Sequence, residues 1–158
     1  MDLDRPRQTI INALTIDLED YYMVSAFESV VKKEYWQQYE SRIECNTHRI
    51  LDILDGADGN TGVKATFFCL GWIGERYPYL IREIDRRGHE IACHSYDHQL
   101  VYRMTPEQFR EDVLISKRIL EDAAGKKVIG YRAPSYSITQ QSLWALDVLG
   151  EEGYRYDS

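Results

Sequence analysis

The feature that most constrains the fold is a repeated alternation between short apolar segments and longer segments with helical periodicity. Short runs rich in β-branched and aromatic residues predict buried strands, whereas apolar residues three and four positions apart predict one face of a helix. The predicted strands cover residues 10–16, 63–70, 89–93, 127–131 and 153–156, and the predicted helices cover residues 45–54, 78–87, 106–124 and 140–149. Strands that alternate with helices favour a parallel sheet covered by helices, and therefore an α/β fold.

Capping signals support these helix boundaries. Thr105, Pro106 and Gln108 have the pattern of a capping box with a proline in the first turn of the helix. Gly88 follows another predicted helix, where glycine commonly ends the helical backbone. The sequence contains no linker, internal repeat or low-complexity tract, so we expect one domain over residues 1–158.

Composition argues against several classes of protein. The formal net charge of -7 is the opposite of the basic face that a nucleic-acid-binding protein presents. No run of residues has the length and apolar character of a membrane span, and the N-terminus lacks the apolar stretch of a signal peptide. The spacing of Cys45, Cys69 and Cys93 does not describe a disulfide framework, which favours a reducing compartment. These observations predict a cytoplasmic location and no nucleic-acid partner.

Three carboxylates crowd the end of the first predicted strand. Asp17, Glu19 and Asp20 follow a run that is otherwise apolar. Unpaired carboxylates are costly to bury, so such a cluster needs cations, hydrogen bonds or solvent. Strand alternation would place Asp17 and Glu19 on one side of the sheet and Leu18 on the other. Taken alone, the cluster fits a solvated loop with an acidic helix cap as well as it fits a functional site.

Two histidines follow the third predicted strand. His94 and His98 stand four residues apart and can converge on one metal ion if the segment turns helically. Two hydrogen-bonding histidines in a loop would show the same spacing. We expect His89, at the other end of the strand, to be structural. His48 lies in a predicted helix and Cys93 faces away from its neighbour, so neither is a candidate ligand.

The segment Arg132-Ala133-Pro134-Ser135-Tyr136 follows the fourth predicted strand. An arginine at a strand end can orient a carboxylate by a two-pronged contact, and the rigid turn can leave backbone N–H groups facing a ligand. Standing alone, the segment would favour a surface turn. However, the carboxyl ends of parallel strands share one edge of the sheet, so we expect all three clusters to meet there. Two histidines and one carboxylate make a three-ligand catalytic metal site, and a spare carboxylate can act as a base.

The three motifs, in this order, resemble those of the polysaccharide deacetylase family, also called the NodB-homology or carbohydrate esterase 4 family. The segments that carry the resemblance are residues 15–20, 88–98 and 132–136. The residues of these three motifs are most similar to those of the branch linked to exosortase-type exopolysaccharide clusters. The resemblance implies a distorted (β/α) barrel, of which this chain would be the N-terminal part, truncated before the later motifs.

The resemblance also implies roles for individual residues. Asp17 would be the general base and Arg132 would hold it in place, while Ser135 and Tyr136 would line the site of the acetyl group. In much of the family the base and the acidic metal ligand are adjacent, and here Leu18 occupies the second position.

The implied metal ligands are therefore His94, His98 and either Glu19 or Asp20. We prefer Glu19, because strand alternation keeps it beside the base. The ion would be divalent, with zinc preferred.

The implied activity is metal-dependent removal of acetyl groups from N-acetylated sugars of a polysaccharide or oligosaccharide, with a metal-activated water as the nucleophile. The histidine that serves the family as general acid would lie beyond Ser158, so we expect this part of the barrel alone to be nearly inactive. Two alternatives stay open. One is an allantoinase-like C–N hydrolase of a small cyclic amide, and the other is a non-catalytic carbohydrate-binding fragment.

Overall fold

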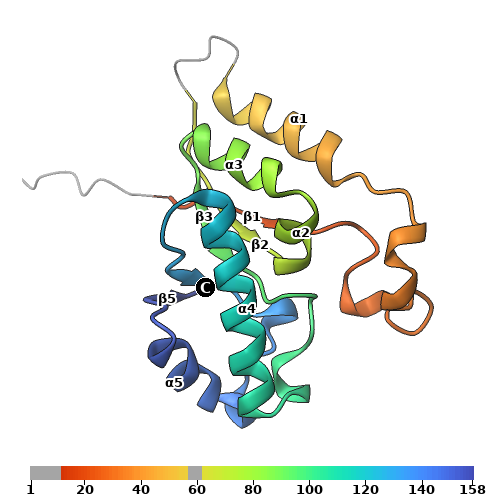
Figure 1. The fold of residues 1–158 in the computed structure, drawn as a ribbon, viewed down its shortest axis with the longest axis vertical. Helices are drawn as coiled ribbons and strands as arrows, with labels where there is room; N and C mark the ends of the chain where they lie inside the picture. Colours follow the sequence, from red (N-terminus) through yellow and green to blue (C-terminus); the bar gives the residue numbers. More distant parts are fainter. Residues whose placement is uncertain (1–11, 57–61) are drawn as a thin grey trace, which may run out of the picture.

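The computed structural model describes residues 12–56 and 62–158 and shows a parallel sheet with helices packed along it (Figure 1). Within this part of the chain the sheet has five strands in the order β1-β2-β3-β4-β5, and every neighbouring pair is parallel. The strands are β1 Thr15–Leu18, β2 Thr66–Cys69, β3 Glu90–Cys93, β4 Gly130–Tyr131 and β5 Tyr156–Asp157. The predicted α/β fold is therefore confirmed.

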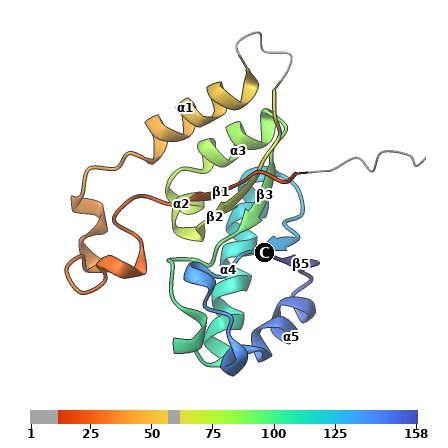
Figure 2. The ribbon, with the colours of Figure 1, turned by 180° about the vertical axis from the view of Figure 1, so that it is seen from behind.

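Helices connect the strands and cover the sheet. They are α1 Ile43–Asp55, α2 Gly71–Arg76, α3 Pro78–Arg86, α4 Pro106–Ala124 and α5 Trp144–Glu151. Helix α4 packs against α2, α3, α5 and β3, whereas α1 packs against α3. Figure 2 shows the molecule from behind, with β1, β2 and β3 in front of α3 and α4. None of the helices in the described ranges has the length and apolar character needed to cross a bilayer.

The core lies between the sheet and these helices. The central strands β2 and β3 are buried on both faces, and Phe67, Phe68, Ile91 and Ala92 are almost fully shielded from solvent. This burial explains why the two strands appear in the sequence as continuous apolar runs without alternation. The capping box at the start of α4 forms as predicted, because Thr105 accepts from the backbone N–H of Gln108 and the Gln108 side chain accepts from the Thr105 N–H.

Two predicted strand boundaries in the C-terminal half are wrong. The strand expected over residues 127–131 is reduced to β4, because the Val128 N–H donates to the Glu121 side chain at 3.0 Å. The strand expected from Gly153 begins later, because the Tyr154 N–H still donates to the Leu149 carbonyl at 2.9 Å at the end of α5.

Two further differences concern the first strand and the last helix. The strand expected over residues 10–16 begins at Thr15, and its positions 10 and 11 lie outside the described residues. The helix expected to begin after Thr139 is divided. A short 3-10 helix at Gln140–Ser142 comes first, since Ser142 closes a capping box with Thr139, and the α-helix begins at Trp144.

Candidate active site

Side chains from the carboxyl ends of three strands line one cavity of about 190 Å³. Asp17 and Glu19 come from the end of β1, His94 and His98 from the loop after β3, and the Arg132 segment from the loop after β4. The residues that line it are Asp17, Glu19, Val24, His94, His98, Arg132, Ala133, Ser135 and Tyr136. Residues far apart in the sequence thus meet because the strands are parallel and end at the same edge.

Glu19, His94 and His98 form a cluster that could hold a metal ion. Each offers one ligand atom, and these atoms all lie within 4.8 Å of one another. Nε2 of His98 is 3.1 Å from Oε2 of Glu19. Nevertheless, among the described residues no group makes a hydrogen bond to this buried carboxylate oxygen. Two ligand atoms that approach closely without hydrogen-bond geometry suit a shared divalent cation, and the set of two imidazoles and one carboxylate is typical of catalytic zinc.

The imidazoles are held in the orientation that such an ion needs. Nδ1 of His94 donates to the backbone carbonyl of Arg132 at 2.7 Å, because a carbonyl can only accept, and this leaves Nε2 free of a proton. Nδ1 of His98 lies 3.0 Å from the hydroxyl of Ser25. Burial lowers the pKa of His94, and burial together with the neighbouring His94 ring lowers the pKa of His98 to about 4. Both rings are therefore neutral near pH 7, which is the form that binds metals.

The electrostatics of Glu19 also favour a cation. Burial, followed by the nearby negative charge of Asp17, raises the pKa of Glu19 to about 7. A buried carboxylate beside a second one is costly to ionise, and a bound cation removes that cost. The residues present therefore fit a divalent metal ion.

Asp17 is held by Arg132 at the edge of the same cavity. Nη1 of Arg132 donates to Oδ1 of Asp17 at 2.7 Å, while Nη2 donates to the hydroxyls of Thr15 and Ser158, each at 2.9 Å. The guanidinium carbon also lies 4.1 Å from the centroid of the Phe68 ring. The Asp17 side chain keeps 36% of its surface exposed, so its carboxylate is oriented but remains accessible.

Asp20, the other acidic candidate, lies outside this cluster. Its Oδ2 accepts from the Ser41 hydroxyl at 2.8 Å and from the Arg42 N–H at 2.9 Å, and its Oδ1 accepts from the Tyr21 N–H at 3.1 Å. These bonds satisfy the buried carboxylate just before α1. Of the two acidic residues considered as ligands, the structure brings only Glu19 to the histidines.

The turn at Ser135 and Tyr136 forms the rim of the cavity. Both residues have positive φ, 49° and 53°, a conformation that non-glycine residues adopt rarely and often at functional sites. Tyr136 is 86% exposed. Its N–H already donates to the Ala133 carbonyl at 3.2 Å, so this group is engaged within the turn.

Two residues that the sequence analysis missed support the histidine loop. Asp112 of α4 is buried, and it accepts from the Ser95 hydroxyl at 3.0 Å and from the Tyr96 N–H at 3.1 Å. Asp112 falls on the buried face of α4, and an acidic residue on a buried helical face is a signal that could have been noticed. Ser25, the partner of His98, begins a short 3-10 helix, Ser25–Phe27, and no periodic pattern in the sequence indicates its role.

Comparison with known proteins connects this site to one family. The sequence profile described as polysaccharide deacetylase matches residues 28–156. The chain is 32% identical over 102 residues to a peptidoglycan-N-acetylglucosamine deacetylase of Bacillus cereus, covering 64% of this chain and 36% of that protein. It is 31% identical over 103 residues to a chitooligosaccharide deacetylase of Bradyrhizobium, covering 65% of this chain and 43% of that protein. The matched part of the chain thus spans less than half of the length of these two relatives.

A solved structure shows the same fold. It belongs to a Mycobacterium smegmatis protein assigned as a polysaccharide deacetylase, and the TM-score is 0.73 at 28% identity. The match covers 92% of this chain and 49% of that one. It confirms the expected architecture, which is part of a NodB-like (β/α) barrel.

Proposed function

Because the chain belongs to the polysaccharide deacetylase family, we propose that it takes part in the metal-dependent removal of acetyl groups from N-acetylated sugars of a polysaccharide or oligosaccharide. The observation that carries the proposal is the convergence of a Glu-His-His cluster with the Asp17–Arg132 pair on one cavity. The names of two relatives, a peptidoglycan-N-acetylglucosamine deacetylase and a chitooligosaccharide deacetylase, support this substrate class. They do not favour a small cyclic amide as the substrate. The narrower placement in the exosortase-linked branch stays a prediction.

In this proposal Glu19, His94 and His98 hold a divalent ion, and zinc is preferred because neutral imidazole and carboxylate are its common ligands. When bound, such an ion polarises the acetyl carbonyl and lowers the pKa of a water. Asp20 takes no part, because its oxygens already accept hydrogen bonds from Ser41 and Arg42.

The remaining residues act by orientation and proton transfer. Asp17 accepts a proton from the attacking water, since its carboxylate reaches the cavity and is not a member of the ligand cluster. Arg132 keeps this carboxylate in place through the contact of 2.7 Å. Ser135 and Tyr136, at the exposed rim, would contact the acetylated sugar.

The proposal is tested with a full-length version of the chain, which would include the later motifs, by measuring acetate release from chitooligosaccharide and from peptidoglycan fragments, before and after removal of metal with a chelator. We expect release to stop without metal and to return with zinc. Asp17→Asn should retain zinc and lose turnover by at least about a hundredfold, the usual size of a general-base contribution. His48→Gln is the matched control, because His48 lies on α1 outside the cluster. Unchanged turnover in Asp17→Asn would disprove the role of Asp17, and metal-independent acetate release would disprove the mechanism.

A further inference from the structure

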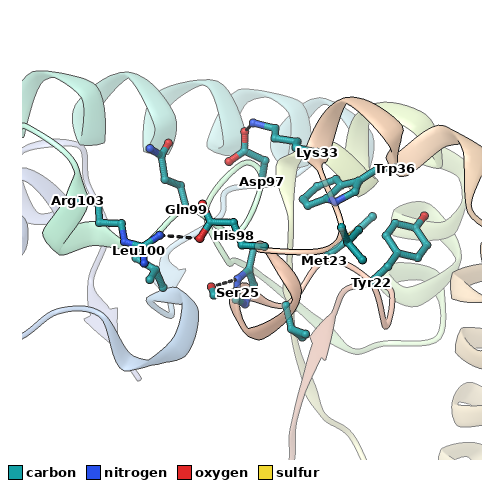
Figure 3. Close-up of a pocket in the computed structure, with 13 residues that line it drawn as sticks. Tyr22, Met23, Ser25, Lys33, Trp36, Asp97, His98, Gln99, Leu100 and Arg103 are labelled. Carbon is teal, nitrogen blue, oxygen red and sulfur yellow. Dashed lines mark hydrogen bonds and ion pairs between the residues drawn. The ribbon is translucent and has the colours of Figure 1, made fainter.

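A second cavity, of about 240 Å³, also borders His98 (Figure 3). It is lined by residues of two segments, 22–36 and 97–103. His98 lines this cavity and also the cavity of the candidate active site. Nε2 faces Glu19, and Nδ1 faces Ser25.

We propose that Ser25 is a positioning residue that fixes the tautomer and the ring orientation of His98. The inference rests on the proposed metal site. An imidazole can offer Nε2 to a metal only if its proton is on Nδ1, and a proton on Nδ1 needs an acceptor when the ring is buried. His98 is 7% exposed, and the Ser25 hydroxyl lies 3.0 Å from Nδ1. A hydroxyl can accept this proton's hydrogen bond, so Ser25 supplies the acceptor.

A comparison with His94 shows why a single substitution can remove the contact between Ser25 and His98. Nδ1 of His94 donates to the backbone carbonyl of Arg132, and no single side-chain substitution removes that acceptor. His98 depends on a side chain instead. A serine hydroxyl can also donate to Nδ1 when Nε2 carries the proton, so loading with metal should select the tautomer in which the hydroxyl accepts.

Contacts around Ser25 hold its segment against the loop that carries His98. Lys33 forms an ion pair with Asp97, and Nη1 of Arg103 lies 2.6 Å from Oε2 of Glu28. Figure 3 shows Lys33 beside Asp97 and the Ser25 hydroxyl against the His98 ring. The Glu28–Arg103 pair is more than half exposed and contributes little, whereas the Asp97 side chain is only 11% exposed.

Deeper in the same segment, buried side chains provide the firmer attachment. Met23 and Trp36 are 2% and 5% exposed and belong to the main core. Trp36 also packs edge-on against Trp72 of α2, with ring centroids 5.5 Å apart. The segment that carries Ser25 is therefore anchored on both sides of the hydroxyl, as a positioning role requires.

Two measurements on the whole chain and its single-residue variants test the inference. The first is zinc affinity by competition with a chromophoric chelator, for wild type, Ser25→Ala, Ser25→Thr and Ser41→Ala. We expect Ser25→Ala to bind zinc about 10-fold to 100-fold more weakly, the usual effect of removing the hydrogen-bond partner of a metal-binding histidine. Ser25→Thr keeps a hydroxyl and should remain near wild type. Ser41→Ala is the matched control, because that hydroxyl bonds to Asp20 outside the cluster.

The second measurement is the ¹⁵N chemical shift of the imidazole nitrogens, which reports the tautomer. Zinc-loaded wild type should show His98 protonated on Nδ1, and metal-free Ser25→Ala should show a larger share of the Nε2-protonated form with His94 unchanged. Urea unfolding of each variant separates this effect from a loss of folding. Equal zinc affinity in wild type and in folded Ser25→Ala would overturn the inference about Ser25. Absence of zinc binding by wild type itself would instead overturn the proposed metal site.

Discussion

At the scale of single residues, two carboxylates only two positions apart have different surroundings. Asp17 accepts from Arg132 at 2.7 Å and keeps part of its side chain exposed. Glu19 faces two imidazoles, and burial raises its pKa to about 7. Arg132 is thus a positive partner of the first carboxylate, whereas the second one lies beside two imidazoles. In the proposed site, this difference in environment separates the role of a base from the role of a metal ligand.

The first prediction concerns Arg132→Lys, which keeps the charge but removes the planar fork. One ammonium cannot reproduce the contacts to Asp17, Thr15 and Ser158 together with the stacking on Phe68. In a full-length version of the chain, we expect kcat for acetate release to fall by about a hundredfold, because a misplaced base lowers the rate of turnover by this order, while zinc content stays unchanged. Steady-state kinetics with elemental analysis provides the check. Wild-type kcat in the lysine variant would show that Asp17 does not need the fork.

The residues of the candidate site were largely predictable, because the rule that placed them is simple. Parallel strands end at one edge, so Asp17, His94 and Arg132, each near a strand end, had to be neighbours. Strand alternation also placed Glu19 on the side of Asp17. Ser25 was not predictable, since its contact with His98 joins residues 73 positions apart and lies in a segment without periodicity.

At the scale of the elements, α4 supports the site although none of its residues lines the cavity. Asp112 lies on its buried face and binds the loop that carries the histidines, through Ser95 and Tyr96. Ser95 and His98 both have positive φ, 69° and 63°, so this loop adopts a conformation that non-glycine residues rarely adopt. Hydrogen bonds from the helix stabilise that conformation.

The second prediction concerns the effect of pH on this contact. Burial raises the pKa of Asp112 from its ordinary value of 3.8 to about 6. A group whose pKa is higher in the folded state contributes stability below its ordinary pKa, and that contribution is lost as the pH rises through the folded value. The free energy of unfolding of wild type, relative to Asp112→Asn, should therefore decrease between about pH 4 and pH 6. Urea unfolding across this range measures it, and a constant difference would contradict the raised pKa.

The sequence predicted some helices and missed others, and each outcome depends on particular residues of the helix. The ends of α4 follow from the capping box of Thr105 and from Gly125, which has a φ of 71°. Helix α2 escaped prediction because it is short and contains Gly71 and Gly74, which disfavour helices. Tertiary packing explains both glycines, because a Cβ atom at either would lie 2.9 Å from a side-chain atom of α4. Such packing cannot be predicted from local pattern.

At the scale of the whole molecule, the candidate metal cluster joins distant parts of the chain. Glu19 follows β1, and both histidines follow β3, while β2 lies between these strands in the sheet. The ligand atoms lie within 4.8 Å of one another only when the strands are in register. An unfolded chain does not hold the three ligands together, so metal binding and folding of the sheet should be thermodynamically coupled.

The last prediction follows from this coupling. A ligand that binds only the folded state at a hundred times its Kd increases the free energy of unfolding by about 2.7 kcal/mol. For a chain of this size, the corresponding rise in Tm is roughly 5–10 °C. Calorimetry with increasing zinc should show this rise in wild type and in the control His48→Gln, and little of it in His98→Ala, which lacks one of the three ligands. An equal rise in His98→Ala would mean that zinc stabilises the fold from another place. If Tm rises in wild type and in His48→Gln but not in His98→Ala, the stabilising ion is located at the ends of β1 and β3.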